Sequence, residues 1–152
     1  MESIDILPAT EEEREWAAQL MSGSDPWITL RRGLEQCRVA CRQPDKLLFV
    51  AHVDAKPCGF VLLQRHGFAG SPYIASIAVA PDQRSTGIGS RLLQFAEDLF
   101  RNESKYIFLC VSSFNARARA LYERHGYSAV GELKDYVIEG ASEILMHKRL
   151  RK

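Results

Sequence analysis

The stretch from Ile74 to Ala96, IASIAVAPDQRSTGIGSRLLQFA, constrains the fold of this 152-residue chain more than any other. It predicts a buried strand, a turn at Pro81 and a glycine-containing turn that opens a helix. From Ile88 onward, apolar residues recur three or four positions apart, as on one face of a helix. The first turn of a helix has N–H groups without a hydrogen-bond partner, and these can bind an anion. Glycines there lack a Cβ, so the anion can approach the backbone closely. We therefore expect an anion cradle at Arg84–Ser90, although two such glycines also serve simply to shape a tight turn.

Two well-known phosphate-binding loops do not match this turn. A Walker loop requires Lys directly after its second glycine, but Ser90 follows Gly89 here. A dinucleotide fingerprint requires a third glycine at the position of Leu92. The sequence therefore disfavours an α/β nucleotide-binding protein.

The rest of the chain predicts a mixed α/β fold with a single domain over residues 1–152, because no repeat or linker interrupts it. Apolar patterns predict hairpin strands towards both ends of the chain and a strand–helix–strand order in its middle, which indicates a mixed sheet with helices on both faces. Strands are expected at 4–7, 46–53, 59–64, 73–80, 106–111, 128–138 and 141–148, and helices at 11–21, 27–42, 88–101 and 115–126.

Composition excludes several classes of protein. Hydrophobic residues make up 46% of the chain and charged residues 26%, which is typical of a globular fold. Twenty basic residues against nineteen acidic ones leave a net charge of +1, so a nucleic-acid partner is not expected. The acidic N-terminus does not resemble a signal peptide, and no apolar run suggests a membrane span. We expect a cytoplasmic protein with no membrane partner.

The four cysteines predict neither a disulfide framework nor a metal site. Cys37 and Cys41 are four residues apart, on one face of the expected helix, and no CxxC pair accompanies them. Small buried apolar side chains explain them better than half of a metal centre does.

A second motif lies between Asn115 and Tyr127. An N-cap amide at Asn115, a core residue at Tyr122 and a C-cap glycine at Gly126 explain it as a helix with ordinary ends. The two motifs together are more specific. Arg84–Gly89 fits the pattern [Q/R]xxGx[G/A], and the second stretch fits NxxAxxxYxxxG[F/Y].

With both motifs in register, nearly the whole chain resembles the GNAT superfamily of acyl-CoA-dependent N-acetyltransferases. The resemblance implies a six- to seven-stranded sheet, mixed but mostly antiparallel, with helices on both faces. It also implies that the strand containing Ile77–Val79 splays away from the strand at Tyr106–Val111, because the chain bulges there. The pantetheine arm of acetyl-CoA enters that gap in the family.

The resemblance also implies roles for individual residues. The amide of Val79 would polarise the thioester carbonyl, Asn115 would hydrogen-bond the pantetheine arm, and Tyr122 would protonate the departing thiolate. Trp27 and Tyr136 would contribute to the acceptor pocket, although packing of the helix turn explains Trp27 equally well. The residues implied to bind acetyl-CoA are Ile77, Ala78, Val79, Arg84, Ser85, Thr86, Gly87, Ile88, Gly89, Ser90, Asn115 and Tyr122.

The general base is not evident from the motifs. Family members that modify protein N-termini often carry a glutamate just before the strand that leads to the glycine turn, and the matching position here is Ser71. A water chain to solvent is one substitute, and side chains are others, each of which a solvated surface position also explains. Those side chains are Glu35, His66, Glu132, Asp135 and Glu139. Arg117 and Arg119 are expected to face solvent, and His125 to cap a helix C-terminus.

The resemblance implies an enzyme that transfers the acetyl group of acetyl-CoA to a primary amine. The acceptor would be a small molecule or a peptide or protein N-terminus, and the amine would attack directly in a ternary complex. The alternative is a non-catalytic acyl-CoA-binding sensor or partner subunit. Tyr122 favours the enzyme, because a pure binding module needs no acid beside the sulfur. The resemblance also allows a homodimer.

Overall fold

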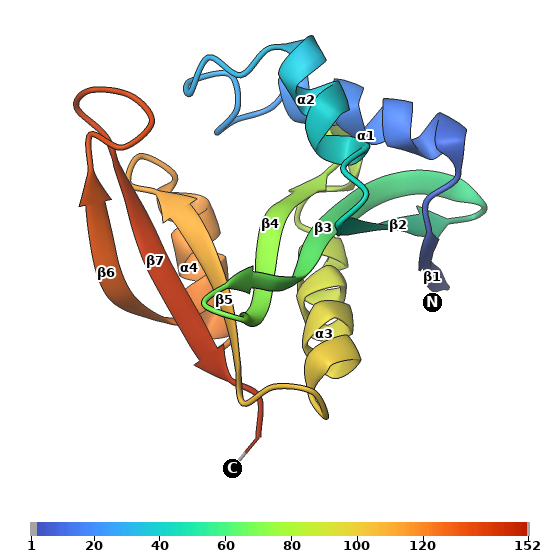
Figure 1. Ribbon diagram of the computed structural model, residues 1–152. Coiled ribbons are helices and arrows are strands. Elements are labelled where there is room, and N and C mark those ends of the chain that lie inside the picture. The colour runs from blue at the N-terminus through green and yellow to red at the C-terminus, as the bar shows by residue number, and fades with distance from the viewer. Residues whose placement is uncertain (1–2, 152) are drawn as a thin grey trace.

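The computed structural model describes residues 3–151 as one seven-stranded sheet in the order β1-β2-β3-β4-β5-β7-β6 (Figure 1). Every neighbouring pair is antiparallel except the parallel pair β4–β5. This arrangement confirms the expected mixed, mostly antiparallel sheet. The strands are β1 (Ile4–Pro8), β2 (Lys46–Val53), β3 (Lys56–Phe68), β4 (Ser71–Val79), β5 (Tyr106–Ser112), β6 (Ser128–Lys134) and β7 (Ser142–Arg149).

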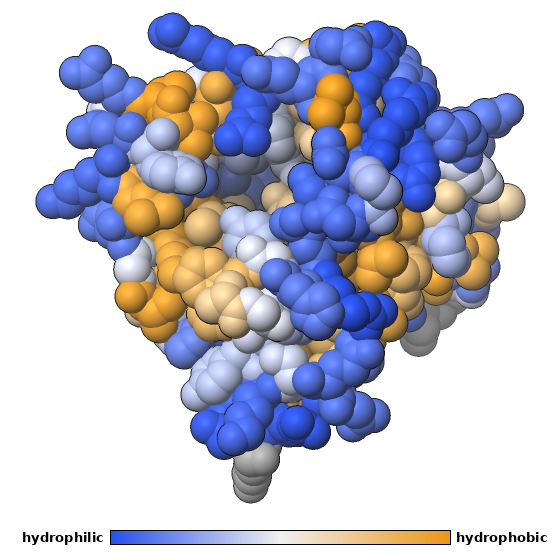
Figure 2. All heavy atoms as spheres, in the orientation of Figure 1, coloured by the Kyte–Doolittle hydropathy of each residue, from blue (hydrophilic) through white to orange (hydrophobic). Residues whose placement is uncertain are grey.

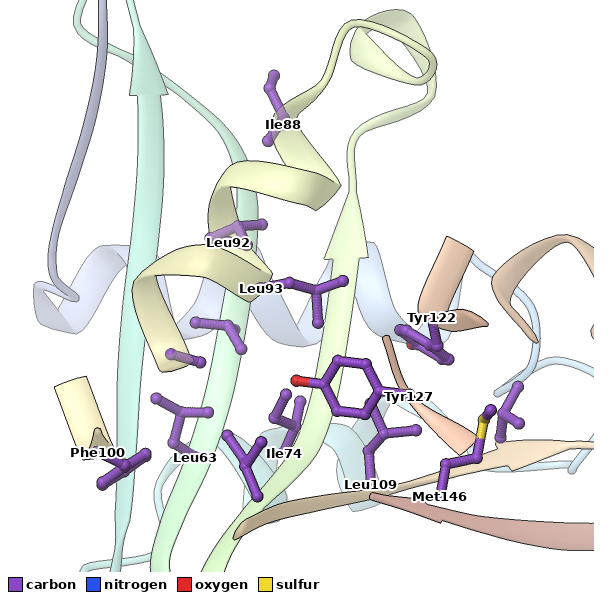
Figure 3. Packing of buried hydrophobic residues seen from close by; sticks show 14 of the residues in the cluster. Leu63, Ile74, Ile88, Leu92, Leu93, Phe100, Leu109, Tyr122, Tyr127 and Met146 are labelled. Carbon is purple, nitrogen blue, oxygen red and sulfur yellow. The ribbon is translucent and has the colours of Figure 1, made fainter. Parts of the chain in front are cut away.

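Helices cover both faces of the sheet, as expected (Figure 1). They are α1 (Glu11–Ser22), α2 (Leu34–Cys41), α3 (Ile88–Phe100) and α4 (Ala116–Arg124), with a short 3-10 turn η1 (Pro81–Gln83) before α3. Because side chains alternate along a strand, Phe60 and Leu62 of β3 point towards α1 and α2. Val61 and Leu63 point to the opposite face, into the cluster beneath α3 and α4 that Figure 3 shows.

The prediction of a helix over residues 27–42 is wrong for the first half of that range. Residues 24–31 form turns, and α2 begins only after Gly33, its N-cap. The Asp25 carboxylate holds the first turn by accepting hydrogen bonds from the Thr29 amide (3.0 Å) and hydroxyl (2.6 Å). Trp27 and Leu30 are nevertheless buried, as are Cys37 and Cys41 in α2. Helix-like spacing therefore identified core residues, although the backbone around Trp27 is not helical.

Two loops also differ from expectation. The loop expected after Gln64 is part of β3, which continues to Phe68 because the Phe68 ring packs on Phe108 with centroids 4.6 Å apart. The actual turn is Ala69–Gly70, where both residues have positive φ. At the other end, β6 stops at Lys134, and residues 135–141 form a loop closed by a hydrogen bond from the Gly140 amide to the Asp135 carboxylate (2.7 Å).

A bulge in β4 separates the two halves of the sheet. Leu62 of β3 lies opposite Ser76, but Leu63 lies opposite Ile74, so Ala75 is an extra residue in β4. The pairing of β4 with β5 is confined to Tyr73–Phe108 and Ile74–Leu109. Beyond the bulge the two strands diverge. The predicted splay is therefore present in the fold.

The cysteines lie in the packing positions that the sequence pattern indicates. All four cysteines are free, and Cys37, Cys41 and Cys58 are buried among apolar side chains. Within residues 3–151, the helices are too short and too polar to cross a membrane.

Candidate active site

A cavity of about 990 Å³ opens where β4 and β5 diverge. Its walls come from these two strands, the glycine turn before α3, the inner side of α4, and the loops after α1 and β6. Figure 2 shows a recess on this face, between the β6–β7 half of the molecule and the α1–α2 loop. The volume is within the range of small-molecule sites, which run to about 1,000 Å³.

The amide of Val79 points into this cavity. The next amide, that of Ala80, donates to the carbonyl oxygen of Cys58 at 2.7 Å, on the β3 side. Because successive residues of a strand present their N–H groups to opposite sides, the Val79 N–H points away from β3 and towards the gap. The same alternation directs the Ile77 N–H into the gap. These two amides are unpaired with β3 and available to an extended ligand.

The glycine turn presents the first turn of α3 to the same cavity. Gly87 is the N-cap of α3 with φ +89°, and it makes no side-chain capping bond. The following amides, Ile88 to Ser90, therefore depend on an external acceptor. A Cβ at Gly87 would meet no atom within 4 Å, so glycine is required there for its backbone conformation. A Cβ at Gly89 would approach the Leu121 side chain to 3.3 Å, so this glycine also lets α3 and α4 pack closely.

Three arginines line the cavity near α3 and α4, namely Arg84 in the glycine turn and Arg117 and Arg124 in α4. Arg84 donates to the Val79 carbonyl oxygen at 3.1 Å and approaches the Ser24 hydroxyl at 3.4 Å. Arg117 is exposed, as expected, and it donates to the Ser85 hydroxyl at 2.8 Å. Cations beside a helix N-terminus make this end of the cavity suitable for a pyrophosphate.

The α4 residues singled out by their motif lie on the cavity wall. Tyr122 is 7% exposed, and burial raises the pKa of its phenol, so the group is protonated and able to donate. Asn115 caps α4 through its side-chain oxygen, which accepts from the Ala118 amide at 3.3 Å. Its NH₂ group is a donor that this cap does not use. His125 is the C-cap of α4, as expected, and its ring contacts the Ser90 hydroxyl at 2.9 Å.

The two residues expected in the acceptor pocket both border the cavity. Trp27 is 8% exposed and packs in the core under α1 and α2, so it combines a packing position with a place in the wall. Tyr136 is 68% exposed and lies in the loop after β6. Both residues thus lie at the end of the cavity between the α1–α2 loop and the β6–β7 loop.

The residues considered as general bases lie elsewhere. Glu35 pairs with Arg38 (3.5 Å), the His66 ring contacts the Gly70 carbonyl oxygen (3.2 Å), and Glu132 accepts from the Ser142 hydroxyl (2.6 Å). The cavity lining includes none of the following positions: Glu35, His66, Ser71, Glu132, Asp135 and Glu139.

A different carboxylate, Glu143, lies in the wall. It is opposite Ser112 in the β5–β7 register, and the Ser112 hydroxyl donates to its Oε2 at 2.6 Å. Sequence reasoning missed both residues. The alternation of SEILMHK, with Ile144 and Met146 buried, indicates that Glu143 faces away from the α3–α4 core, but only the splay of the sheet shows that a cavity lies there.

The model of the acetyltransferase (GNAT) family matches residues 9–127. The chain belongs to the GNAT family. An uncharacterized N-acetyltransferase of Methanocaldococcus jannaschii is 35% identical over 103 residues, which span 66% of this chain and 65% of that relative. An N-alpha-acetyltransferase of Saccharolobus solfataricus is 31% identical over 114 residues, or 67% of this chain and 68% of the relative.

Solved GNAT structures share the fold. A candidate GNAT acetyltransferase of Desulfovibrio desulfuricans superposes with a TM-score of 0.84 over 98% of this chain and 100% of its own, at 17% identity. A candidate streptothricin acetyltransferase of Bacillus anthracis, solved with acetyl coenzyme A, has a TM-score of 0.64 over 71% of this chain and 64% of its own, at 21% identity. GNAT enzymes use acetyl-CoA as acyl donor. The gap, the Val79 amide and the glycine turn of this chain fit that molecule.

Proposed function

We propose that residues 1–152 act as one N-acetyltransferase domain, which transfers the acetyl group of acetyl-CoA to a primary amine. The observation that carries the proposal is the Val79 amide, which faces the gap between β4 and β5, in the cavity that the glycine turn and Tyr122 also line. A free backbone donor suits a carbonyl oxygen that gains negative charge, and a protonated phenol suits a departing thiolate. A module that only binds acyl-CoA has no use for the second group.

Acetyl-CoA supplies the activated acetyl thioester, and the chain's own residues hold it and move protons. The amides at the start of α3, with Arg84 and Arg117, bind the pyrophosphate. The Asn115 amide and the β4 backbone orient the pantetheine arm. The Val79 N–H donates to the carbonyl oxygen during attack by the amine in a ternary complex, and the Tyr122 hydroxyl gives its proton to the sulfur.

The acceptor we propose is a small-molecule amine or the α-amine of a peptide or protein. The Saccharolobus relative, an N-alpha-acetyltransferase, supports a peptide N-terminus. The streptothricin acetyltransferase fold supports a small amine. Trp27 and the largely exposed Tyr136 line the end of the cavity where the acceptor would enter.

The test is thiol release from acetyl-CoA with a panel of amines. The panel contains tetrapeptides that begin with Ala, Ser or Met, together with streptothricin and spermidine, and the Nα-acetylated peptides serve as blocked controls. Release with a free amine and not with its blocked form supports the proposal. Acetyl-CoA binding by calorimetry without release for any amine supports the acyl-CoA sensor instead. Absence of binding contradicts both.

A further inference from the structure

Glu143 lies on the opposite side of the sheet from Tyr122, although both residues line the cavity. In β5, Leu109 and Val111 pack in the cluster that contains Tyr122, so the alternating residue Ser112 faces the α1–α2 side. Glu143 is directly opposite Ser112 and shares that face. The gap between β4 and β5 therefore joins a carboxylate on one face to a phenol on the other.

The Glu143 carboxylate accepts a hydrogen bond through one oxygen, and its other oxygen is not used by that bond. The Ser112 hydroxyl, on a residue only 3% exposed, donates to Oε2 at 2.6 Å and fixes the carboxylate orientation. Oε1 is not used by this bond. A half-buried carboxylate that retains one acceptor oxygen towards a cavity is suited to bind an ammonium group.

The titratable and charged groups that line the cavity on the Glu143 side come from β4, β5 and the neighbouring loops, while β6 places the apolar Leu133 opposite Glu143. Burial raises the pKa of Tyr73 in β4, with the Cys110 thiol and Glu143 adding to this effect. Burial also raises the pKa of Cys110 in β5, so both neighbours are neutral. The loops contribute Tyr136, the exposed Arg32, and Asp25, whose carboxylate is already bound to Thr29. Glu143 is the carboxylate that a strand contributes to the described cavity wall, whereas Asp25 lies in the loop after α1, where its Oδ1 accepts both bonds from Thr29.

We propose that Glu143 binds the ammonium group of the acceptor and takes its proton before attack. This inference rests on the proposed acetyl transfer. The ammonium loses one proton to the Glu143 carboxylate, and the amine lone pair then forms the N–C bond. The C–S bond breaks, and the sulfur takes the Tyr122 proton. The second amine proton returns through water to the Tyr122 oxygen, and Glu143 releases its proton to solvent, so one proton leaves per turnover.

This arrangement puts the first deprotonation of the amine and the protonation of the thiolate on opposite sides of the sheet. The amine enters from the α1–α2 side and is deprotonated there, whereas the thiolate is protonated beside α4. The base candidates from the sequence lie outside the cavity lining, and Glu143 supplies the missing group from β7.

Glu143→Gln is the informative variant, because an amide keeps the size of the side chain and can still accept from Ser112. Its matched control is Glu132→Gln, since Glu132 also accepts from a serine hydroxyl at 2.6 Å but lies outside the cavity lining. With the best amine of the panel, Glu143→Gln should lower kcat/KM by about 10²-fold or more. The acidic limb of the pH–rate profile should disappear, with acetyl-CoA affinity within about twofold of wild type. Glu143→Asp, which retains the charge, should recover part of the rate.

A binding measurement distinguishes failure of this inference from failure of the proposed function. Calorimetric titration of the CoA-saturated protein with the free-amine tetrapeptides and streptothricin should show weaker binding to Glu143→Gln than to wild type or Glu132→Gln. Equal amine affinity, or an unchanged pH profile and kcat/KM, overturns the role of Glu143, and so does absence of amine binding to wild type. Amine binding that depends on Glu143 without any thiol release overturns only the proposed acetyl transfer.

Discussion

Tyr122 combines two properties that rarely occur together in a core residue. It packs against Tyr127 at a centroid distance of 6.1 Å, within the cluster beneath α3 and α4, and it also borders the cavity (Figure 3). Burial keeps the phenol protonated by raising its pKa, as a proton donor requires. The packing positions the ring, and the proposed proton donation uses only its hydroxyl.

Tyr122→Phe should therefore separate these two properties. We expect kcat to fall by about 10²-fold or more, with little change in acetyl-CoA affinity or in the midpoint of thermal unfolding, because only the hydroxyl is lost. Steady-state kinetics and calorimetry measure these effects. Tyr106→Phe, at a position outside the cavity lining, is the control and should retain wild-type turnover. Equal turnover by Tyr122→Phe would make Tyr122 a packing residue only.

At the scale of elements, the turn before α3 depends on a left-handed residue at position 87. Gly87 has φ +89° and open space where a Cβ would lie. Gly70, in the β3–β4 turn, has φ +84° and equally open surroundings, but it lies outside the cavity lining. The two glycines form a matched pair in which only one borders the proposed phosphate site.

Gly87→Ala and Gly70→Ala should each destabilise the protein by about 1 kcal/mol, since alanine disfavours positive φ. Only Gly87→Ala should weaken acetyl-CoA binding, by about tenfold. Alanine at position 87 is strained at positive φ, and relief of this backbone strain moves the amides at the start of α3 that would bind the phosphate. Urea unfolding and calorimetry provide the two readouts. If both variants bind acetyl-CoA as wild type does, the glycine turn is not the phosphate cradle.

The start of α1 carries a pH-dependent contribution to stability. Glu13 completes a capping box with Thr10 and contacts the His52 ring of β2 at 2.5 Å. Burial alone would raise the pKa of Glu13, but hydrogen bonds from Thr10 and His52 outweigh it, so the pKa is lowered. A lowered folded pKa means that the stabilisation is complete above the unfolded value of about 4.3 and is lost as pH falls through the folded value.

Glu13→Gln should lower the free energy of unfolding by about 1 kcal/mol at pH 7, because the charged cap and its partners are weakened. The difference from wild type should shrink as the pH falls below about 4. Denaturant unfolding at several pH values measures this dependence. Glu12→Gln, in the same exposed first turn, controls for loss of a charge near the helix N-terminus. A difference that is constant from pH 7 to pH 3 would contradict the assignment.

At the scale of the whole molecule, a buried polar network joins the second half of the sheet to α3. Glu97 of α3 is fully buried, accepts from the Tyr127 hydroxyl at 3.0 Å and pairs with Lys148 of β7 at 2.7 Å. The β4–β5 pairing is short, so this network is a substantial connection across the splay. Removal of Glu97 leaves the partly buried Lys148 ammonium without its counter-charge and the buried Tyr127 hydroxyl without its acceptor.

Glu97→Ala should lower the free energy of unfolding by about 3 kcal/mol. The double variant Glu97→Met with Lys148→Met should be more stable than Glu97→Ala, because no unpaired charge remains and the volume is refilled. Urea unfolding of the three proteins tests this order. A double variant less stable than Glu97→Ala would show that the ion pair itself stabilises the fold.

The sequence alone determined the fold class, most strand positions, the glycine turn and the motif helix α4, because each of these is encoded by neighbouring residues. A positive φ requires glycine at position 87, and the apolar period of α3 is visible within a dozen residues. Tertiary structure decided the rest. The β5–β7 register brings Glu143 to Ser112, and the bulge at Ala75 opens the cavity beside them. Such contacts depend on pairing between distant segments, which local periodicity does not encode.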